Sequence, residues 1–429
     1  MQREDFTLRT VLDLSVESRR GQPHSKTSRT ELRALRRASI LECGCLLPLL
    51  VIGVLAIASA VAGAAHVEVI RTPDGGIQPQ ATVDNRGVVH LIYFKGEADG
   101  GDVFYVHRKS GETKFSKSIK VNSQSGSVTA MGTIRGAQLA IGKNGRVHVV
   151  WDGMGKGATR VKINDKEEAP LLYTRLNDSS TGFEPERNLI TFAAGLDGGS
   201  SVAADAQGNV YVAWHAPQPG NTNGEAGRAV FVAHSGDEGK TFGREKAALS
   251  KPTGACPCCG MRAFADRAGA VYILFRAATE HANRDETLLI SPRPGADFTI
   301  ANVHKWNANI CPMSSATLTE ANAGLVAAWE TGNQVYFANV NSKTMQVSEP
   351  ISPAGKANRK HPVAVENKRG ETLLVWTENT SWGKGGVVVW QLFDPDGKAI
   401  SEEKRADGLP PWSLATAFAA SNGDFVIVY

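Results

Sequence analysis

The pattern that decides the fold is clearest in the stretch Asp205-Ala206-Gln207-Gly208-Asn209-Val210-Tyr211-Val212-Ala213-Trp214. A polar turn with a glycine leads into a short apolar strand, and the strand ends on an aromatic residue. Glycine supplies the positive φ that a tight hairpin turn needs. The aromatic side chain offers a large apolar surface for packing between sheets. The stretch therefore indicates a β-hairpin in a layered, strand-rich fold.

The same unit recurs along the chain from residue 66 onward. It ends each time on an aromatic residue, at Tyr93, Trp151, Trp214, Phe275, Trp329, Trp376 and Tyr429. The spacings between these residues are 58, 63, 61, 54, 47 and 53. Repeats of about 50 residues with two to four strands each are typical of β-propeller blades. We therefore predict an all-β fold with a seven-bladed propeller, or a six-bladed one if one hairpin is absorbed elsewhere.

The last repeat ends at Tyr429 after only two strands. The apolar segment Val67–Ile70 lies at the other end of the repeat region and is expected to complete this blade. Closure of this kind would join the two ends of the propeller. It would also cover sheet edges that otherwise favour aggregation.

Residues 1–65 differ from the rest and are expected to form a leader, with the propeller at 66–429. Three arginines between positions 33 and 37 precede an apolar run, and small residues follow at 58–65. This order is typical of a secretory signal with an A-x-A cleavage site. A retained membrane anchor is the alternative, because the apolar part is about long enough to span a bilayer. In both cases we expect an exported propeller: periplasmic, extracellular, or anchored and facing outward.

The charge of the chain lies mainly in this leader. The net charge is +4, and the leader accounts for +3 of it. The remaining residues include 38 basic and 37 acidic side chains, so the propeller is nearly neutral. Because affinity for nucleic acid depends on Lys and Arg that neutralise phosphates, no nucleic-acid partner is expected. A membrane is expected as a partner only through an uncleaved leader.

Residues 235–242 read Ser-Gly-Asp-Glu-Gly-Lys-Thr-Phe and fit the pattern S-x-D-x-G-x-T-[W/F]. This pattern resembles the Asp-box turn, or BNR repeat, of sialidase-like β-propellers, which joins the third and fourth strands of a blade. Ser and Asp side chains in such a turn can hydrogen-bond turn amides while the aromatic residue packs inward. The resemblance therefore implies a structural role for Ser235, Asp237, Gly239, Thr241 and Phe242.

The resemblance to sialidases does not extend to their catalytic motifs. Sialidases imply an arginine triad, a Tyr–Glu nucleophile pair and an acid/base Asp, and their first arginine usually lies in an F/Y-R-I-P motif. This sequence has no such motif, and the segment Thr133-Ile134-Arg135-Gly136 offers an arginine without the proline. Glycoside hydrolysis is therefore left open and no catalytic residue is assigned. Arg135 is kept as a candidate ligand-binding residue.

Four of the six cysteines lie within 56 residues of sequence, at Cys256, Cys258, Cys259 and Cys311. The elements Cys256-Pro257-Cys258-Cys259 and Cys311-Pro312 resemble a subgroup of exported sialidase-like propellers. That subgroup has a C-x-C-C element and a later C-P element at the starts of consecutive blades. Each element here precedes an expected inner strand, at 262–265 and at 314–318. Adjacent inner strands would bring the four thiols together at one face of the central channel.

Three interpretations of these cysteines are open. An exported protein meets an oxidising compartment, so Cys311 could form a disulfide with one of the other three and clamp two blades. The cluster could instead hold a metal. Cys together with Met261 and Met313 favours copper, whereas four thiolates alone suit zinc. His361 is a further candidate ligand, although a lone histidine more often lines a channel. Free or catalytic thiols are the third interpretation.

Four further residues are candidates for binding a ligand at the channel mouth: Arg276, Arg284, Asp285 and Trp306. Arginines there could hold a carboxylate or sulfate bidentately, and a tryptophan could stack on a sugar ring. The alternatives are a plain ion pair with Asp285 and a packing role for Trp306. Our leading hypothesis is an exported sialidase-like propeller that binds or processes a carbohydrate, or binds a small anion, at the channel mouth. The alternative is a non-catalytic scaffold with a disulfide or soft-metal cysteine cluster.

Overall fold

The computed structural model describes residues 64–280, 282–355 and 358–429. Most of the expected leader, including Cys43 and Cys45, lies outside the described residues. Within them the helices are short 3-10 turns, at Pro73–Gly75, Lys143–Gly145 and Gly224–Gly227. No helix in this described part is long and apolar enough to cross a membrane.

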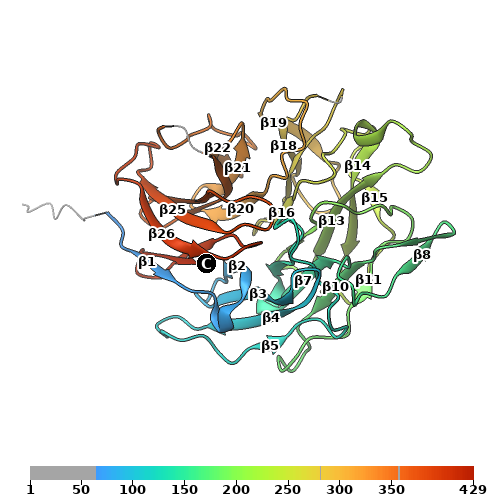
Figure 1. The fold of residues 1–429 in the computed structure, drawn as a ribbon, viewed down its shortest axis with the longest axis horizontal. Coiled ribbons are helices and arrows are strands. Elements are labelled where there is room, and N and C mark those ends of the chain that lie inside the picture. Colours follow the sequence, from blue (N-terminus) through green and yellow to red (C-terminus); the bar gives the residue numbers. More distant parts are fainter. Residues whose placement is uncertain (1–63, 281, 356–357) are drawn as a thin grey trace, which may run out of the picture. The chain divides into compact units, whose positions relative to one another are not determined.

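The strands form seven sheets that are the blades of a propeller (Figure 1). The strands of each blade are given from the innermost outward. The first blade has β2 (Ile77–Val83), β3 (Val89–Glu97), β4 (Gly100–Arg108) and β5 (Ile119–Lys120), and the second has β6 (Gln138–Ile141), β7 (Val147–Asp152), β10 (Leu171–Arg175) and β11 (Arg187–Asn188). The third blade has β12 (Ser201–Ala204), β13 (Val210–Pro217), β14 (Arg228–Ser235) and β15 (Lys246–Ala247). The next two are β16 (Arg262–Ala265), β17 (Val271–Arg276), β18 (Glu286–Ser291) and β19 (Thr299–His304); and β20 (Ala316–Ala321), β21 (Gly324–Thr331) and β22 (Gln334–Asn341). The last two are β23 (Arg359–Glu366), β24 (Thr372–Glu378), β25 (Gly386–Phe393) and β26 (Lys404–Leu409); and β27 (Thr416–Ala419), β28 (Phe425–Val428) and β1 (Val67–Ile70). A small hairpin, β8 (Val161–Ile163) and β9 (Lys166–Glu168), extends from the second blade.

The innermost strands close a ring. Each of β2, β6, β12, β16, β20, β23 and β27 contacts the inner strand of the next blade, and β27 contacts β2. The prediction of an all-β, seven-bladed propeller is therefore confirmed, and the six-bladed alternative is not needed. The seventh blade is completed by β1, which pairs in parallel with β28 so that Val67 lies opposite Phe425.

The aromatic residue that ends each repeat is buried between blades. Trp214 lies at the end of the apolar part of β13 and packs with Val150 and Tyr173 of the second blade. Its indole Nε1 donates a hydrogen bond to the Ala193 carbonyl (2.9 Å). The other six repeat aromatics are buried as well. Burying a side chain of this size contributes about 2–3 kcal/mol, so the repeat supplies much of the adhesion between blades.

The turn at residues 235–242 joins β14 to β15, which are the third and fourth strands of the third blade. The Ser235 hydroxyl accepts a hydrogen bond from the Gly239 amide (2.9 Å). The Asp237 carboxylate accepts from both the amide and the hydroxyl of Thr241 (2.8 and 2.7 Å). Phe242 packs edge-on against Tyr173 of the second blade, with ring centroids 4.8 Å apart. The turn is therefore rigid, and it fixes the third blade against the second.

Candidate functional site

The two cysteine-bearing loops meet at one face of the propeller. Residues 256–259 precede the inner strand β16, and Cys311 precedes the neighbouring inner strand β20. The two strands contact each other and lie near the middle of the ring in Figure 1. The prediction that adjacent blades bring the four thiols together is therefore confirmed.

Four sulfur atoms form one cluster at this point. Cys258 and Cys311 are joined by a disulfide, while Cys256 and Cys259 are free and buried. The Sγ atoms of Cys256 and Cys259 are 3.2 Å apart, and Cys256 Sγ is 3.6 Å from Cys258 Sγ. The disulfide interpretation is thus supported, and Cys258 is the partner of Cys311. We call these four residues the cysteine centre.

The two free thiols have different surroundings. Cys259 Sγ accepts hydrogen bonds from the Ser314 amide (3.4 Å) and hydroxyl (3.3 Å). Burial raises the pKa of the Cys259 thiol, but the Cys256 thiol, the Arg276 charge and Ser314 outweigh this effect and bring the pKa to about 7. The pKa of Cys256 is raised by its contact with Cys259 and by burial. Of the two free thiols, Cys259 therefore has the lower pKa.

Two arginines near the cysteine centre are buried in ion pairs. Arg276 pairs with Glu286 (2.9 Å) and donates to the Ser314 hydroxyl (2.9 Å). Arg284 pairs with Glu225 and donates to the Ile310 carbonyl (3.0 Å). Both guanidinium groups are therefore engaged within the protein. The Arg276 charge lowers the pKa of Cys259 and the Arg284 charge acts on Cys256, and neither guanidinium forms an exposed anion site.

Both arginines are buried and pair with glutamates, whereas the alternative expected from the sequence was a surface ion pair of Arg276 or Arg284 with Asp285. Arg276 and Glu286 lie directly opposite each other in β17 and β18. Because successive residues of a strand point to opposite faces, Asp285 points away from Arg276 when Glu286 faces it. The Asp285 carboxylate accepts instead from the Trp306 amide (2.9 Å). Trp306 is half-buried, with the Arg276 guanidinium 5.2 Å from its ring centre.

The two methionines that were candidate ligands lie in different places. Met313 packs directly against the cysteine centre. Met261 is buried in the core between the third and fourth blades, among Ala203, Tyr211 and Ile273. One thioether therefore accompanies the cluster, and the other contributes to apolar packing.

The remaining two candidates are held by other partners. His361 is buried, and its Nδ1 is 3.1 Å from the Ser315 hydroxyl. Burial lowers the pKa of His361 to about 3, so its ring is neutral at physiological pH. Arg135 pairs with Asp197 (2.8 Å) and donates to the Asp197 carbonyl (2.6 Å).

Sequence reasoning missed two buried residues at this face, Asp152 and His215. His215 Nε2 lies 3.3 Å from the Cys259 carbonyl oxygen, and its Nδ1 lies 3.0 Å from Arg228 Nη2. Burial lowers the pKa of His215 to about 3. Burial raises the pKa of Asp152 to about 7. Asp152 directly follows the repeat aromatic Trp151, and His215 directly follows Trp214. The position after a repeat aromatic could therefore have indicated both residues.

The channel mouth itself offers little room. A narrow cavity there has a volume of about 20 Å³ and is lined in part by Gln78, Gln80, Met261 and Arg262. This volume holds roughly one water molecule. A sugar ring does not fit into this cavity.

Comparison with known proteins gives similarity at the level of solved structures. No known family profile and no curated protein sequence matches the chain. Similar structures include the Hadza microbial sialidase Hz136, with 13% identity, a TM-score of 0.46, and coverage of 76% of this chain and 70% of that one. They also include the intramolecular trans-sialidase from Ruminococcus gnavus, with 12% identity, a TM-score of 0.40, and 81% and 88% coverage. The Penicillium chrysogenum alpha-L-arabinanase has 10% identity, a TM-score of 0.44, and 80% and 98% coverage. We transfer no residue role or activity from these proteins.

Proposed function

We propose that this protein is an exported β-propeller whose cysteine centre binds a soft cation, Cu(I) in preference to Zn²⁺, once the Cys258–Cys311 disulfide is reduced. The observation that carries the proposal is the meeting of four sulfur atoms from two neighbouring blades, three on buried cysteines and one on the exposed Cys311. The Sγ atoms of Cys256, Cys258 and Cys311 all lie within 4.8 Å of one another. Cys259 Sγ adjoins that of Cys256.

The spacing of the sulfur atoms supports a metal site. Four thiolates around one zinc ion lie about 2.3 Å from the metal, and hence about 3.8 Å from one another. Two of the separations here are 3.2 and 3.6 Å, close to that value, while the sulfur atoms of Cys258 and Cys311 are bonded and must separate first. Reduction of the disulfide by a dithiol consumes two electrons and two protons and yields two further thiols.

The surroundings favour Cu(I) over Zn²⁺. Met313 adds a thioether beside the cysteines, and thioether ligands select Cu(I). Arg276 and Arg284 are buried nearby, each in an ion pair with a glutamate.

The test compares reduced and oxidised protein under anaerobic conditions, with Cu(I) delivered from a chromophoric chelator. We expect one Cu(I) per reduced chain, and loss of that binding in the double variant Cys256→Ser/Cys259→Ser. Met313→Leu should weaken Cu(I) binding, whereas the matched control Met261→Leu should not, since that methionine lies in the core. Preferential binding of Zn²⁺, or the absence of stoichiometric copper, would refute the proposal.

Export, the Asp-box resemblance and the C-x-C-C subgroup belong to the same proposal. An oxidising compartment would hold Cys258 and Cys311 as a disulfide by default, so that a reductant controls access to the metal site. Sequencing the N-terminus of mature protein from a secreting cell tests the leader: a start near residue 63 or 65 supports cleavage. An intact start on protein recovered in the cytoplasm would contradict export.

A further inference from the structure

A basic recess lies on the rim of the propeller, between the second and third blades. It has a volume of about 380 Å³ and is lined by two facing segments, residues 187–191 and residues 240–244. The first segment begins with the outer strand β11, and the second is the end of the turn between β14 and β15. Three of the lining side chains are cationic: Arg187, Lys240 and Arg244.

These three cations are not neutralised by carboxylates. Among the residues that the structure describes, none of the three has a carboxylate oxygen within 4.0 Å. Lys240 and Arg244 are exposed, and Arg187 is half-buried. Because unpaired charges of one sign in a concave surface concentrate counter-ions, the recess attracts anions.

The recess is held rigidly. The Arg187 guanidinium lies over the rings of Tyr173 and Phe242, 5.4 and 5.7 Å from their centres, and contacts the Gly239 carbonyl. The buried carboxylate of Glu245 accepts hydrogen bonds from three successive amides at residues 191–193, at 2.8 to 3.0 Å. Both walls are therefore fixed before any ligand arrives, which reduces the entropic cost of binding.

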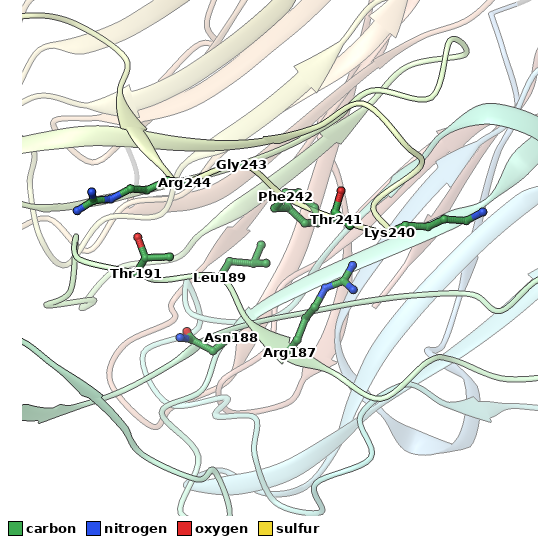
Figure 2. Close-up of a pocket in the computed structure, with 9 residues that line it drawn as sticks. All are labelled: Arg187, Asn188, Leu189, Thr191, Lys240, Thr241, Phe242, Gly243 and Arg244. Carbon is green, nitrogen blue, oxygen red and sulfur yellow. The ribbon is translucent and has the colours of Figure 1, made fainter.

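The arrangement of the cations fits an extended ligand better than a single ion. In Figure 2, Lys240 and Arg244 reach toward opposite ends of the recess, and Arg187 lies between the two segments. The neutral lining between them includes Thr191 and Thr241, whose hydroxyl groups donate to Glu245 and Asp237 and keep oxygen lone pairs that can accept from a ligand hydroxyl. A chain that alternates anionic groups with hydroxyl-bearing rings would satisfy both kinds of wall. A volume of 380 Å³ lies within the range of small-ligand sites.

We propose that this recess binds an acidic polysaccharide through its sulfate or carboxylate groups. The site is separate from the cysteine centre and does not depend on the proposed metal binding. Nucleic acid is the less suitable polyanion, because the propeller as a whole carries a net charge of only +1. Phosphate-backbone binding gains most of its affinity from many Lys and Arg contacts over a wide surface.

The experiment measures binding of labelled hexasaccharides to the purified full chain by fluorescence anisotropy at low salt. The probes are a sulfated uronic-acid hexasaccharide, an unsulfated uronic-acid hexasaccharide and a neutral hexasaccharide. We expect both acidic probes to bind at least about tenfold more tightly than the neutral one. The triple variant Arg187→Gln/Lys240→Gln/Arg244→Gln should lose roughly 10- to 100-fold, because three charge contacts disappear. Added salt should weaken binding of the wild type.

The matched control removes the same charge elsewhere. Lys114, Lys117 and Lys398 are exposed, and their triple Gln variant should change affinity by less than about twofold. Since Arg187 packs on two aromatic rings, Lys240→Gln/Arg244→Gln is the second test variant, which keeps that packing intact. Equal losses in the test and control variants would overturn the proposal. Tighter binding of a single-stranded oligonucleotide, or full competition by inorganic sulfate at a matched sulfate concentration, would overturn it as well.

Discussion

Reduction of the Cys258–Cys311 disulfide should destabilise the propeller by a calculable amount. The bridge joins the loops that enter the fourth and fifth blades, and its cysteines are 53 residues apart in sequence. In the chain-entropy model, a closed loop of this length restricts the unfolded chain by about 14 cal/mol/K. At 25 °C this corresponds to about 4 kcal/mol of stability. The estimate is an upper figure, because structure that persists in the unfolded chain reduces the effect.

The perturbation is the double variant Cys258→Ala/Cys311→Ser, in which the buried site receives an apolar residue and the exposed site a polar one. Urea unfolding can be followed by tryptophan fluorescence, since Trp151 and Trp214 become exposed when the blades separate. We expect the midpoint to fall by about 1 M, because the urea m-value of so large a chain is about 3 kcal/mol/M or more. Treatment of the wild type with a reductant should give a similar fall.

The control is Cys256→Ser, which leaves the disulfide intact. It should unfold at nearly the wild-type midpoint when oxidised and show the same fall on reduction. Thiol titration of unreduced, denatured protein should give two free thiols from the propeller, which are Cys256 and Cys259. The reasoning is refuted if the double variant is as stable as oxidised wild type while thiol titration confirms that the wild-type bridge is present.

Three further predictions concern other parts of the molecule. Burial raises the pKa of the Asp152 carboxyl from 3.8 to about 7, so this group lowers the stability of the wild type as the pH rises from 4 through 7. Asp152→Asn should remove up to about 4 kcal/mol of this pH dependence. Parallel pH profiles of thermal unfolding for the two proteins would contradict the assignment. Asp237→Ala removes two hydrogen bonds to Thr241 and should lower the free energy of unfolding, measured with denaturant, by about 1–3 kcal/mol. A decrease below about 0.5 kcal/mol would mean that the turn does not depend on these hydrogen bonds. Deletion of residues 64–71 removes β1 and exposes β28, so the melting temperature should fall and light scattering should detect association; a monomer of unchanged melting temperature would rule out a role for this strand in closure.

The repeat was sufficient to predict the fold because it encodes two independent requirements in each blade. The glycine marks the turn between the first two strands, and the aromatic residue marks the surface that packs on the neighbouring blade. Both are local in sequence, so neither depends on knowing which blades meet. The position of the cysteine centre followed from the same topology, since both cysteine elements precede the inner strands of consecutive blades.

Details that depend on side-chain direction were not predictable in the same way. The partner of Arg276 is Glu286 rather than Asp285, and this one-residue difference is decided by strand register. Met261 and Met313 follow their cysteines at similar distances, yet one points into the core and the other to the thiols. The basic recess was missed because its walls come from two blades and exposed Lys and Arg residues show no periodicity.

The residue after the repeat aromatic forms a second pattern at the cysteine-bearing face. In the blades from the second to the sixth it is polar and buried, as Asp152, His215, Arg276, Glu330 and Thr377. In three of these blades it contacts the polypeptide that enters the next blade. His215 contacts the Cys259 carbonyl, Arg276 donates to Ser314, and Glu330 accepts from the amide of His361.

This pattern has a consequence for the proposed metal site. The loop that carries Cys259 is held by His215 of the preceding blade, and Ser314, three residues after Cys311, is held by Arg276. Neither contact involves the disulfide. When the Cys258–Cys311 bond is reduced, both loops therefore keep their anchors, and the four thiols stay close together although the covalent link between the blades is lost. A ligand set that is held in place before the metal arrives avoids the cost of ordering two loops on binding. Reduction would thus convert a structural bridge into a preorganised metal site at the same position.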